Sequence, residues 1–190
     1  MLIKIGILAL QGNFVQHHIM LKSLDVNPIY VYYPSDLDGC DGLIIPGGES
    51  TTMSIQMKRN GFRKSIKKFS KKKSILGTCA GMIMLSAENK SNNVEPLGLM
   101  DFTVSRNAWG RQVDSFCDKL TLEFDSVKYF KGVFIRAPII SRLGKDIKVL
   151  ATYNDEPVMV TDGTHYASSF HPEIGYDNRI HSYYLDQINA

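Results

Sequence analysis

The chain has few cysteines, no long apolar run and little net charge, and each shortage excludes a class of protein. Its 190 residues include three cysteines, Cys40, Cys79 and Cys117, an odd number without the spacing of a disulfide framework. The apolar run 2–10 is about half as long as a membrane span and has no small-residue cleavage site after it. A formal charge of +3 is too small to indicate nucleic-acid binding by itself. We therefore expect a cytoplasmic protein with a single domain, residues 1–190.

One cysteine lies in a pattern that is typical of an enzyme nucleophile. In Gly77-Thr78-Cys79-Ala80-Gly81 a glycine stands two residues before the cysteine and another two residues after it. An apolar run precedes this segment and a run at helical spacing follows it, which predicts a sharp strand-to-helix turn that exposes the thiol. The partial positive charge of a helix N-terminus favours the thiolate. A buried structural cysteine is the alternative, because that is the commoner fate of cysteines.

Strands and helices alternate in the first half of the chain. This alternation predicts a doubly wound, mostly parallel sheet with flanking helices, in which an active site lies beyond the carboxyl ends of the strands. Asn13 and one of Ser50 or Thr51 are the expected helix caps. The expected strands are 2–10, 29–33, 42–45 and 75–76, and the expected helices are 13–24, 50–59 and 62–69.

The second half of the chain reads mostly as strands, which adds a β-rich section to the α/β fold. A polar loop is expected over 89–95, and a closing helix over 178–188. Neither a low-complexity linker nor an internal repeat divides the chain. The expected strands are 102–105, 120–124, 133–136, 149–153, 157–161 and 166–170.

A cysteine nucleophile needs a base, and His171 is the best placed of five histidines. It follows an apolar strand and continues as Pro172-Glu173. Proline stiffens the turn, and the carboxylate of Glu173 can hold the imidazole in the tautomer that accepts the thiol proton. By itself His-Pro-Glu reads as a surface turn, but together with Cys79 it predicts a Cys–His–Glu triad.

The segment Pro46-Gly47-Gly48-Glu49-Ser50-Thr51-Thr52 follows another expected strand. Two glycines allow unusual backbone conformations, and exposed N–H groups in such a turn bind anions. The segment lacks the lysine and the spacing of a phosphate-binding loop, which argues against a nucleotide. The segment reads equally well as a tight strand–helix connection or, next to Cys79, as the source of an oxyanion donor.

These motifs closely resemble the triad-type glutamine amidotransferases and, more narrowly, the family of glutaminase subunits of pyridoxal 5′-phosphate synthases. The resemblance extends over essentially the whole chain. The narrower resemblance rests on Leu10-Gln11-Gly12, on the segment from Arg106 to Gln112 with Ser115-Phe116, and on Phe134-Ile135-Arg136-Ala137-Pro138. The chain departs from the family pattern at Trp109, Cys117 and residues 174–176, none of which belongs to the predicted triad.

The resemblance implies a flavodoxin-like glutamine amidotransferase fold and the hydrolysis of L-glutamine to glutamate and ammonia, with no cofactor and no metal. It implies a hetero-oligomer with a (β/α)₈-barrel synthase subunit that uses the ammonia to make pyridoxal 5′-phosphate. Cys79 would be the nucleophile, His171 the acid and base, and Glu173 the group that orients the imidazole. Backbone N–H groups of Ala80 and Gly48 would form the oxyanion hole. The substrate contacts implied are Gly47, Gly48, Glu49, Arg106, Ile135 and Arg136.

Other functions remain open at this point. A glutaminase can serve a different ammonia acceptor, a cysteine peptidase or deglycase can use the same elbow, and a regulatory subunit can keep the fold without the chemistry. The run of lysines from Lys64 to Lys73 suggests a patch for nucleic acid or anionic lipid, but no aromatic platform or recognition motif accompanies it. We therefore expect there a solvated helix face or, equally, a face toward the partner subunit, and neither nucleic acid nor membrane as a partner.

Overall fold

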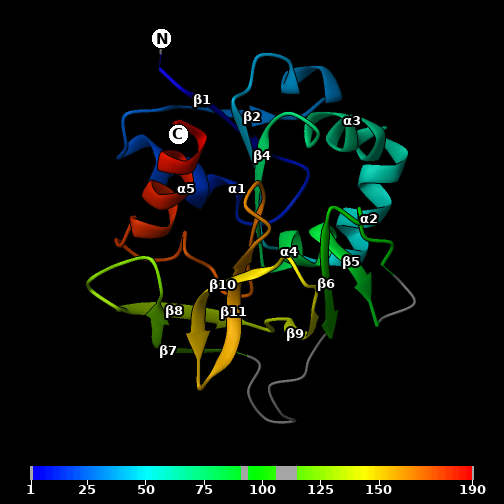
Figure 1. Ribbon diagram of the computed structural model, residues 1–190. Coiled ribbons are helices and arrows are strands. Elements are labelled where there is room, and N and C mark those ends of the chain that lie inside the picture. The colour runs from blue at the N-terminus through cyan, green and yellow to red at the C-terminus, as the bar shows by residue number, and fades with distance from the viewer. Residues whose placement is uncertain (1, 91–93, 106–114, 190) are drawn as a thin grey trace.

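Helices and strands alternate through the first half of the molecule, as the apolar pattern predicts (Figure 1). The computed structural model describes residues 2–90, 94–105 and 115–189. The elements of the first half are β1 (Lys4–Leu8), α1 (Phe14–Lys22), β2 (Asn27–Val31), the 3₁₀ turn η1 (Pro34–Leu37), β3 (Gly42–Ile45), α2 (Ser50–Arg59), α3 (Phe62–Phe69), β4 (Ser74–Thr78) and α4 (Ala80–Leu85).

Strands dominate the second half until a closing helix. These elements are β5 (Ser86–Asn89), β6 (Met100–Ser105), β7 (Ser115–Leu122), β8 (Tyr129–Ile135), β9 (Ile139–Leu143), β10 (Lys148–Tyr153), β11 (Glu156–Thr161), β12 (Tyr166–Ser168) and α5 (Arg179–Asn189). Among the described residues, nine strands form one sheet in the order β2-β1-β3-β4-β12-β11-β10-β7-β8, and β5-β6-β9 form a second. The first five strands of the large sheet run parallel and the others antiparallel. This arrangement confirms the predicted doubly wound fold with a β-rich second half.

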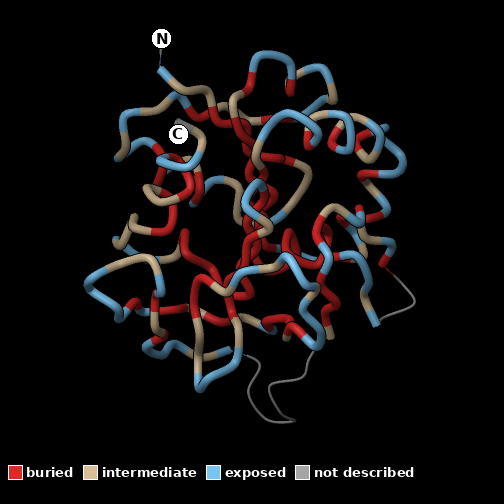
Figure 2. The backbone as a smooth tube through the Cα atoms, viewed as in Figure 1, coloured by how far each residue is buried: buried red, intermediate tan, exposed pale blue. Residues whose placement is uncertain are grey.

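Two apolar clusters pack on the two faces of the parallel strands. Because side chains alternate along a strand, Leu43 and Ile45 face α2, α3 and α4, whereas Ile44 faces α1 and α5. Figure 1 shows α1 and α5 on one side of the sheet and α2, α3 and α4 on the other, and Figure 2 shows buried backbone concentrated along the central strands. The strand ends that carry the functional groups are therefore held between two helix layers.

The structure differs from the sequence-based prediction at several boundaries. Strand β2 begins at Asn27 and includes Pro28, which is tolerated because β2 is an edge strand. The expected cap residues of α2 were wrong, since its N-cap is Glu49. Strands β5 and β9 were not predicted, because they are short and each is held by pairing with β6. The expected loop 89–95 lies partly outside the described residues.

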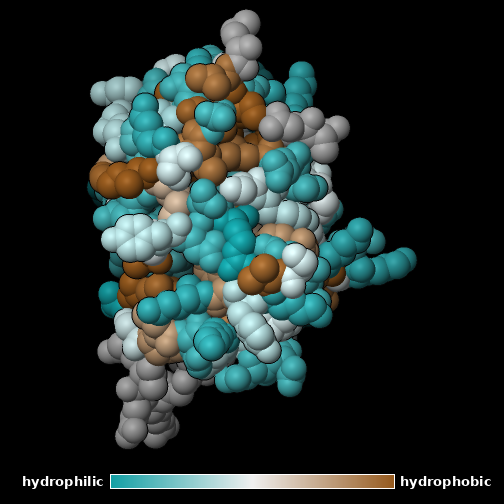
Figure 3. Space-filling model, turned by 90° about the vertical axis from the view of Figure 1, so that its left-hand side faces the viewer, coloured by the Kyte–Doolittle hydropathy of each residue, from teal (hydrophilic) through white to brown (hydrophobic). Residues whose placement is uncertain are grey.

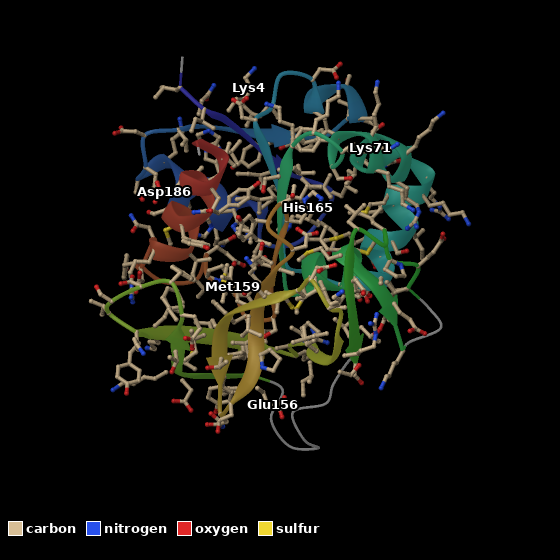
Figure 4. The ribbon with its side chains drawn as sticks, in the orientation of Figure 1. Lys4, Lys71, Glu156, Met159, His165 and Asp186 are labelled. Carbon is tan, nitrogen blue, oxygen red and sulfur yellow. The ribbon has the colours of Figure 1, made fainter. Side chains whose placement is uncertain are left out.

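The face of the molecule on the left-hand side of Figure 1 is mostly hydrophilic. Figure 3 shows that on the left-hand side of Figure 1 apolar side chains form separate patches among hydrophilic ones. The lysine run follows the outer side of α3, whose Phe62 and Ile66 are buried while Lys67 and Lys68 are exposed. Lys71, just beyond α3 and labelled in Figure 4, is also exposed. This burial pattern agrees with a solvated helix face.

Candidate active site

The predicted elbow lies between β4 and α4. Strand β4 ends at Thr78, α4 begins at Ala80, and Cys79 between them has a φ of 49° and a ψ of −102°. Few non-glycine residues adopt a positive φ, and such strain is typical of functional turns. A Cβ atom at Gly81 would lie 2.0 Å from the carbonyl oxygen of Ile45, so α4 packs against β3 only with glycine there. The backbone N–H of Cys79 donates to the carbonyl oxygen of Ser168 at 2.8 Å, which ties the elbow to β12.

His171 and Glu173 follow β12, beside the elbow. The backbone N–H of His171 donates to the carbonyl oxygen of Val133 at 2.8 Å, which fixes the residue against β8. Nδ1 of His171 lies 2.7 Å from Oε1 of Glu173, and both residues are 4% exposed. Asn13, at the start of α1, donates through its side-chain amide to the same Oε1 at 3.2 Å. The carboxylate of Glu173 thus holds the imidazole of His171 through its Nδ1 atom.

The charges of these groups suit an acid–base role. Burial by itself lowers the pKa of His171, but hydrogen bonds with Cys79 and Glu173 outweigh it and raise the pKa to about 10. Burial raises the pKa of Glu173, but proximity to His17 and the hydrogen bond with His171 reverse the shift and lower it to about 2. At neutral pH the site therefore holds a carboxylate and an imidazolium next to the cysteine. A protonated imidazole is the group that can donate a proton to a leaving amine.

A cavity of about 260 Å³ lies in front of these groups. It has room for a small polar molecule such as an amino acid. Its wall combines the thiol with backbone of two loops, and Sγ of Cys79 lies 3.7 Å from the carbonyl oxygen of Ile135. The lining residues are Asn13, Gly48, Glu49, Ser50, Cys79, Ala80, Ile83, Ile135, Arg136 and His171.

Cys40 illustrates the structural alternative to a nucleophile. Its thiol donates to the carbonyl oxygen of Asp36 at 3.3 Å, and burial raises its pKa. A larger hollow of about 440 Å³ lies next to it, and the described residues that line this hollow include no histidine. A thiol with a raised pKa and no base is inert, so Cys40 packs rather than reacts.

The loop between β3 and α2 lies close to the imidazole. A Cβ atom at Gly47 would lie 2.3 Å from Cε1 of His171 and 3.2 Å from Cβ of Cys79, so only glycine lets the loop approach both groups. The side chain of Gln11 makes two hydrogen bonds with the backbone of Glu49. Its Nε2 donates to the carbonyl oxygen of Glu49 at 2.9 Å, and its Oε1 accepts from the N–H of Glu49 at 3.2 Å. The carboxylate of Glu49 accepts from the N–H groups of Thr51 and Thr52, which caps α2.

The structure brings most of the predicted site residues together around one cavity. Cys79 and His171 line it with Ala80, and Glu173 lies directly behind His171. The implied substrate contacts Gly48, Glu49, Ile135 and Arg136 are also in the lining, and Gly47 adjoins it. Arg106 lies outside the described residues.

Two residues near the triad were missed by the sequence analysis. Asn13 was expected only as a helix cap, but its side chain makes no cap hydrogen bond and contacts Glu173 instead. His17 is fully buried, with Nε2 3.4 Å from Oε2 of Glu173. These two residues are four apart on α1 and so share one face of the helix, a spacing that was visible in the sequence.

Two other findings concern only the residues that the structure describes. Within them, no group of three or more histidine, cysteine, aspartate or glutamate side chains is arranged to hold a metal ion. The same residues include no helix that is long and apolar enough to cross a membrane.

The doubly wound sheet, with a strained cysteine beside a His–Glu pair, defines a glutamine amidotransferase-like protein. The chain belongs to the SNO glutamine amidotransferase family, whose model matches residues 7–190. It is 45% identical over 187 residues to the pyridoxal 5′-phosphate synthase subunit PdxT of Thermosipho africanus, covering 97% of this chain and 98% of that one. It is also 45% identical over 185 residues to the PdxT of Oenococcus oeni, covering 97% and 96% of the two chains.

Solved structures agree with this assignment. A crystal structure of a glutamine amidotransferase superposes with a TM-score of 0.92 at 42% identity, covering 98% of this chain and 99% of that one. A structure of PurLQS from Thermotoga maritima has a TM-score of 0.70 at 18% identity, with 98% and 99% covered. At that identity the second likeness concerns the fold alone.

Proposed function

We propose that the chain is a single glutaminase domain that hydrolyses L-glutamine to L-glutamate and ammonia through Cys79, His171 and Glu173. The observation that carries the proposal is the position of His171, which lines the same small cavity as Cys79 and has Nδ1 2.7 Å from Oε1 of Glu173. Membership of a glutamine amidotransferase family supports the choice of substrate.

In the first half of the reaction the thiolate of Cys79 attacks the side-chain amide carbon of glutamine and forms a C–S bond. The tetrahedral intermediate collapses, the C–N bond breaks, and the imidazolium of His171 gives its proton to the departing ammonia. In the second half the neutral imidazole takes a proton from water, which attacks the thioester. Glutamate then leaves, and the thiolate and imidazolium are restored. Glu173 orients the ring through Nδ1 in both halves.

The cavity walls supply the other groups that the reaction needs. The backbone N–H groups of Ala80 and Gly48 stabilise the oxyanion. Arg136 is exposed and lines the cavity, where its guanidinium can bind the α-carboxylate of glutamine through paired hydrogen bonds. The other substrate contacts are Gly47, Glu49, Ile135 and Arg106.

We further propose that the ammonia passes to a separate synthase subunit with a (β/α)₈ barrel, which makes pyridoxal 5′-phosphate in the cytoplasm. Support comes from the relatives that match nearly the full chain, each named as a subunit of pyridoxal 5′-phosphate synthase. A glutaminase that supplies a different acceptor is the alternative.

The test is the release of glutamate from glutamine by the wild type and by Cys79→Ala, each alone and with the synthase subunit of the same organism. We expect hydrolysis by the wild type, an increase when the synthase is added, and a loss of at least roughly 1,000-fold in Cys79→Ala. Hydrolysis without any response to the synthase would keep the chemistry and reject the acceptor. Folded protein without glutamate release in either condition would reject both.

A further inference from the structure

A second pair of histidines lies behind the triad. His17 from α1 and His181 from α5 are fully buried, and Nδ1 of His17 lies 2.9 Å from Nε2 of His181. Their ring centroids are 5.1 Å apart. Two buried imidazoles from opposite ends of the chain therefore share one hydrogen bond, and the reaction proposed above does not use either of them.

The other ring nitrogen of His17 faces the triad. Its Nε2 lies 3.2 Å from Oγ1 of Thr78, the residue before the nucleophile, and 3.4 Å from Oε2 of Glu173. Within the described part of the chain, that Oε2 is buried and has no hydrogen-bonding partner, so its approach to Nε2 of His17 is a close contact of the two groups and the hydrogen bond of Nε2 goes to Thr78. By contrast, Oε1 of Glu173 is held by His171 and Asn13. A buried carboxylate oxygen without a donor is costly, and His17 is the group placed to supply one.

The histidine pair is uncharged at neutral pH. Burial lowers the pKa of His17, although Glu173 acts in the opposite direction. Burial also lowers the pKa of His181, to about 3. Each ring therefore carries a single N–H, and the shared hydrogen bond can be arranged in only two ways.

The two arrangements differ in what they present to Glu173. If His17 donates to His181 through Nδ1, its Nε2 turns a lone pair toward the carboxylate, and the N–H of His181 at Nδ1 has no acceptor among the described residues. If His181 donates through Nε2, the N–H of His17 at Nε2 points to Thr78 and Glu173, and only a lone pair on His181 is unpartnered. The second arrangement removes the repulsion at Glu173 and leaves no N–H of the pair without an acceptor. It is favoured because buried N–H groups without a partner are rarer in proteins than buried acceptors without one.

We propose that His17 and His181 are positioning residues for the glutaminase reaction, in which His181 donates from Nε2 to His17 and His17 presents Nε2–H to Oε2 of Glu173. Hydrogen bonds then hold Oε1 of the carboxylate while the facing N–H of His17 attracts Oε2, and together they orient the plane of the His171 ring. The inference about the reaction rests on the proposed function. The arrangement of the hydrogen atoms does not, and it is tested separately.

The first test reads the two tautomers by NMR of protein labelled with ¹⁵N-histidine. Long-range ¹H–¹⁵N spectra distinguish Nδ1–H, Nε2–H and doubly protonated rings, and spectra of His17→Gln and His181→Gln assign the signals. We expect both rings to be neutral and protonated at Nε2 at pH 7. An Nδ1–H tautomer or a doubly protonated ring at either position would overturn the proposal, whatever the protein's activity.

The second test uses two amides that imitate different nitrogens of His17. Glutamine places its amide near the position of Nε2 and keeps a donor for Glu173, whereas asparagine reaches only the position of Nδ1. We expect His17→Asn to lower kcat about 10- to 100-fold, the usual effect of losing a hydrogen bond to a charged group. His17→Gln should recover most of that loss. KM for glutamine should stay within about twofold in both variants, because His17 does not line the cavity.

The matched control is His18→Gln. His18 is the next residue on α1, but its ring stacks on Tyr30 with centroids 4.6 Å apart, away from the triad. Thermal unfolding of each variant shows whether it is folded, so that a lower kcat in folded protein can be attributed to misalignment of the triad. If His17→Asn does not fold, His181→Gln, which keeps a donor, is measured in its place. Equal losses in the two His17 variants, or a loss confined to KM, would contradict a positioning role. Glutamate release that survives Cys79→Ala would instead reject the proposed function and leave the NMR result standing.

Discussion

The side-chain amide of Asn13 donates to Oε1 of Glu173 across 3.2 Å, although 160 residues separate the two in the chain. The same amide nitrogen lies 3.3 Å from Nδ1 of His171. Asn13 is held in place by its own backbone, whose N–H donates to the carbonyl oxygen of Gly47 at 3.0 Å. The first helix therefore begins at the triad.

The contact predicts the effect of Asn13→Ala. The variant removes one donor from a buried carboxylate, which is worth about 1.5–3 kcal/mol, so we expect kcat for glutamine hydrolysis to fall about 10- to 100-fold. Steady-state kinetics test this, with Asn27→Ala on the exposed part of β2 as the control. An unchanged kcat in folded Asn13→Ala would show that His171 and Glu173 need no support from Asn13.

Gly47→Ala should disable the site without unfolding the protein. The added Cβ would lie 2.3 Å from Cε1 of His171, so the ring or the loop has to move. A displacement of about 1 Å at a catalytic group costs on the order of 100-fold in rate. Gly6→Ala is the control, since it also crowds a buried neighbour, Cγ2 of Val31 at 2.9 Å, but far from the cavity. Similar activity losses in both variants would attribute the effect to general crowding.

His181→Gln should change how stability depends on pH. Burial lowers the pKa of His181 in the folded state from 6.5 to about 3. Below pH 6.5 the unfolded chain therefore binds a proton at His181 that the folded chain does not bind. The free energy of unfolding has its full value above pH 6.5 and decreases as the pH is lowered toward 3. From pH 8 to pH 5 this costs the wild type about 2 kcal/mol, a loss that the variant escapes.

Urea unfolding at the two pH values measures this difference. His18→Gln is the control, because His18 is only partly buried and its variant should alter the pH dependence much less. A wild type and a His181→Gln variant that lose stability in parallel would mean that His181 is protonated in the folded protein.

Glu49→Ala should destabilise the protein at neutral pH and much less in acid. Burial raises the pKa of Glu49, but hydrogen bonds from Thr52 and Thr51 outweigh it and lower the pKa to about 2. The contribution of the Glu49 carboxylate to the free energy of unfolding is present above pH 4.5 and is lost as the pH falls toward 2. Loss of an N-cap costs about 1 kcal/mol, which urea unfolding at pH 7 resolves. Glu123→Ala, at another exposed glutamate, should have little effect at either pH.

Local patterns in the sequence were enough to predict the framework of this fold. Residues 42–45 and 62–69 have the bounds that were expected for a strand and a helix, because an apolar run and a helical stripe of apolar residues define them. Strands β5 and β9 escaped prediction because they exist only through pairing with β6. Their own residues are partly polar and exposed, so no alternation marked them.

The candidate site divides in the same way. The glycines around Cys79 and the segment from His171 to Glu173 are local motifs, so the sequence pointed to them directly. The contacts of His17 are not local, since they join α1 to β4, to the turn after β12 and to α5. Which of two adjacent histidines on α1 turns inward depends on how that helix lies on the sheet, and composition does not contain this information.

The central position of β12 has a consequence for the order of events during synthesis. This late strand lies between β4 and β11, and its carboxyl end leads to His171. A growing chain that emerges from its N-terminus first can pair β1, β2, β3 and β4 early, but one edge of β4 then stays open until β12 arrives. Open edges invite wrong pairing, so the nascent chain passes through a vulnerable stage. During that stage His171 is not yet in place beside Cys79, so the proposed nucleophile and its proposed base meet only as the sheet is closed.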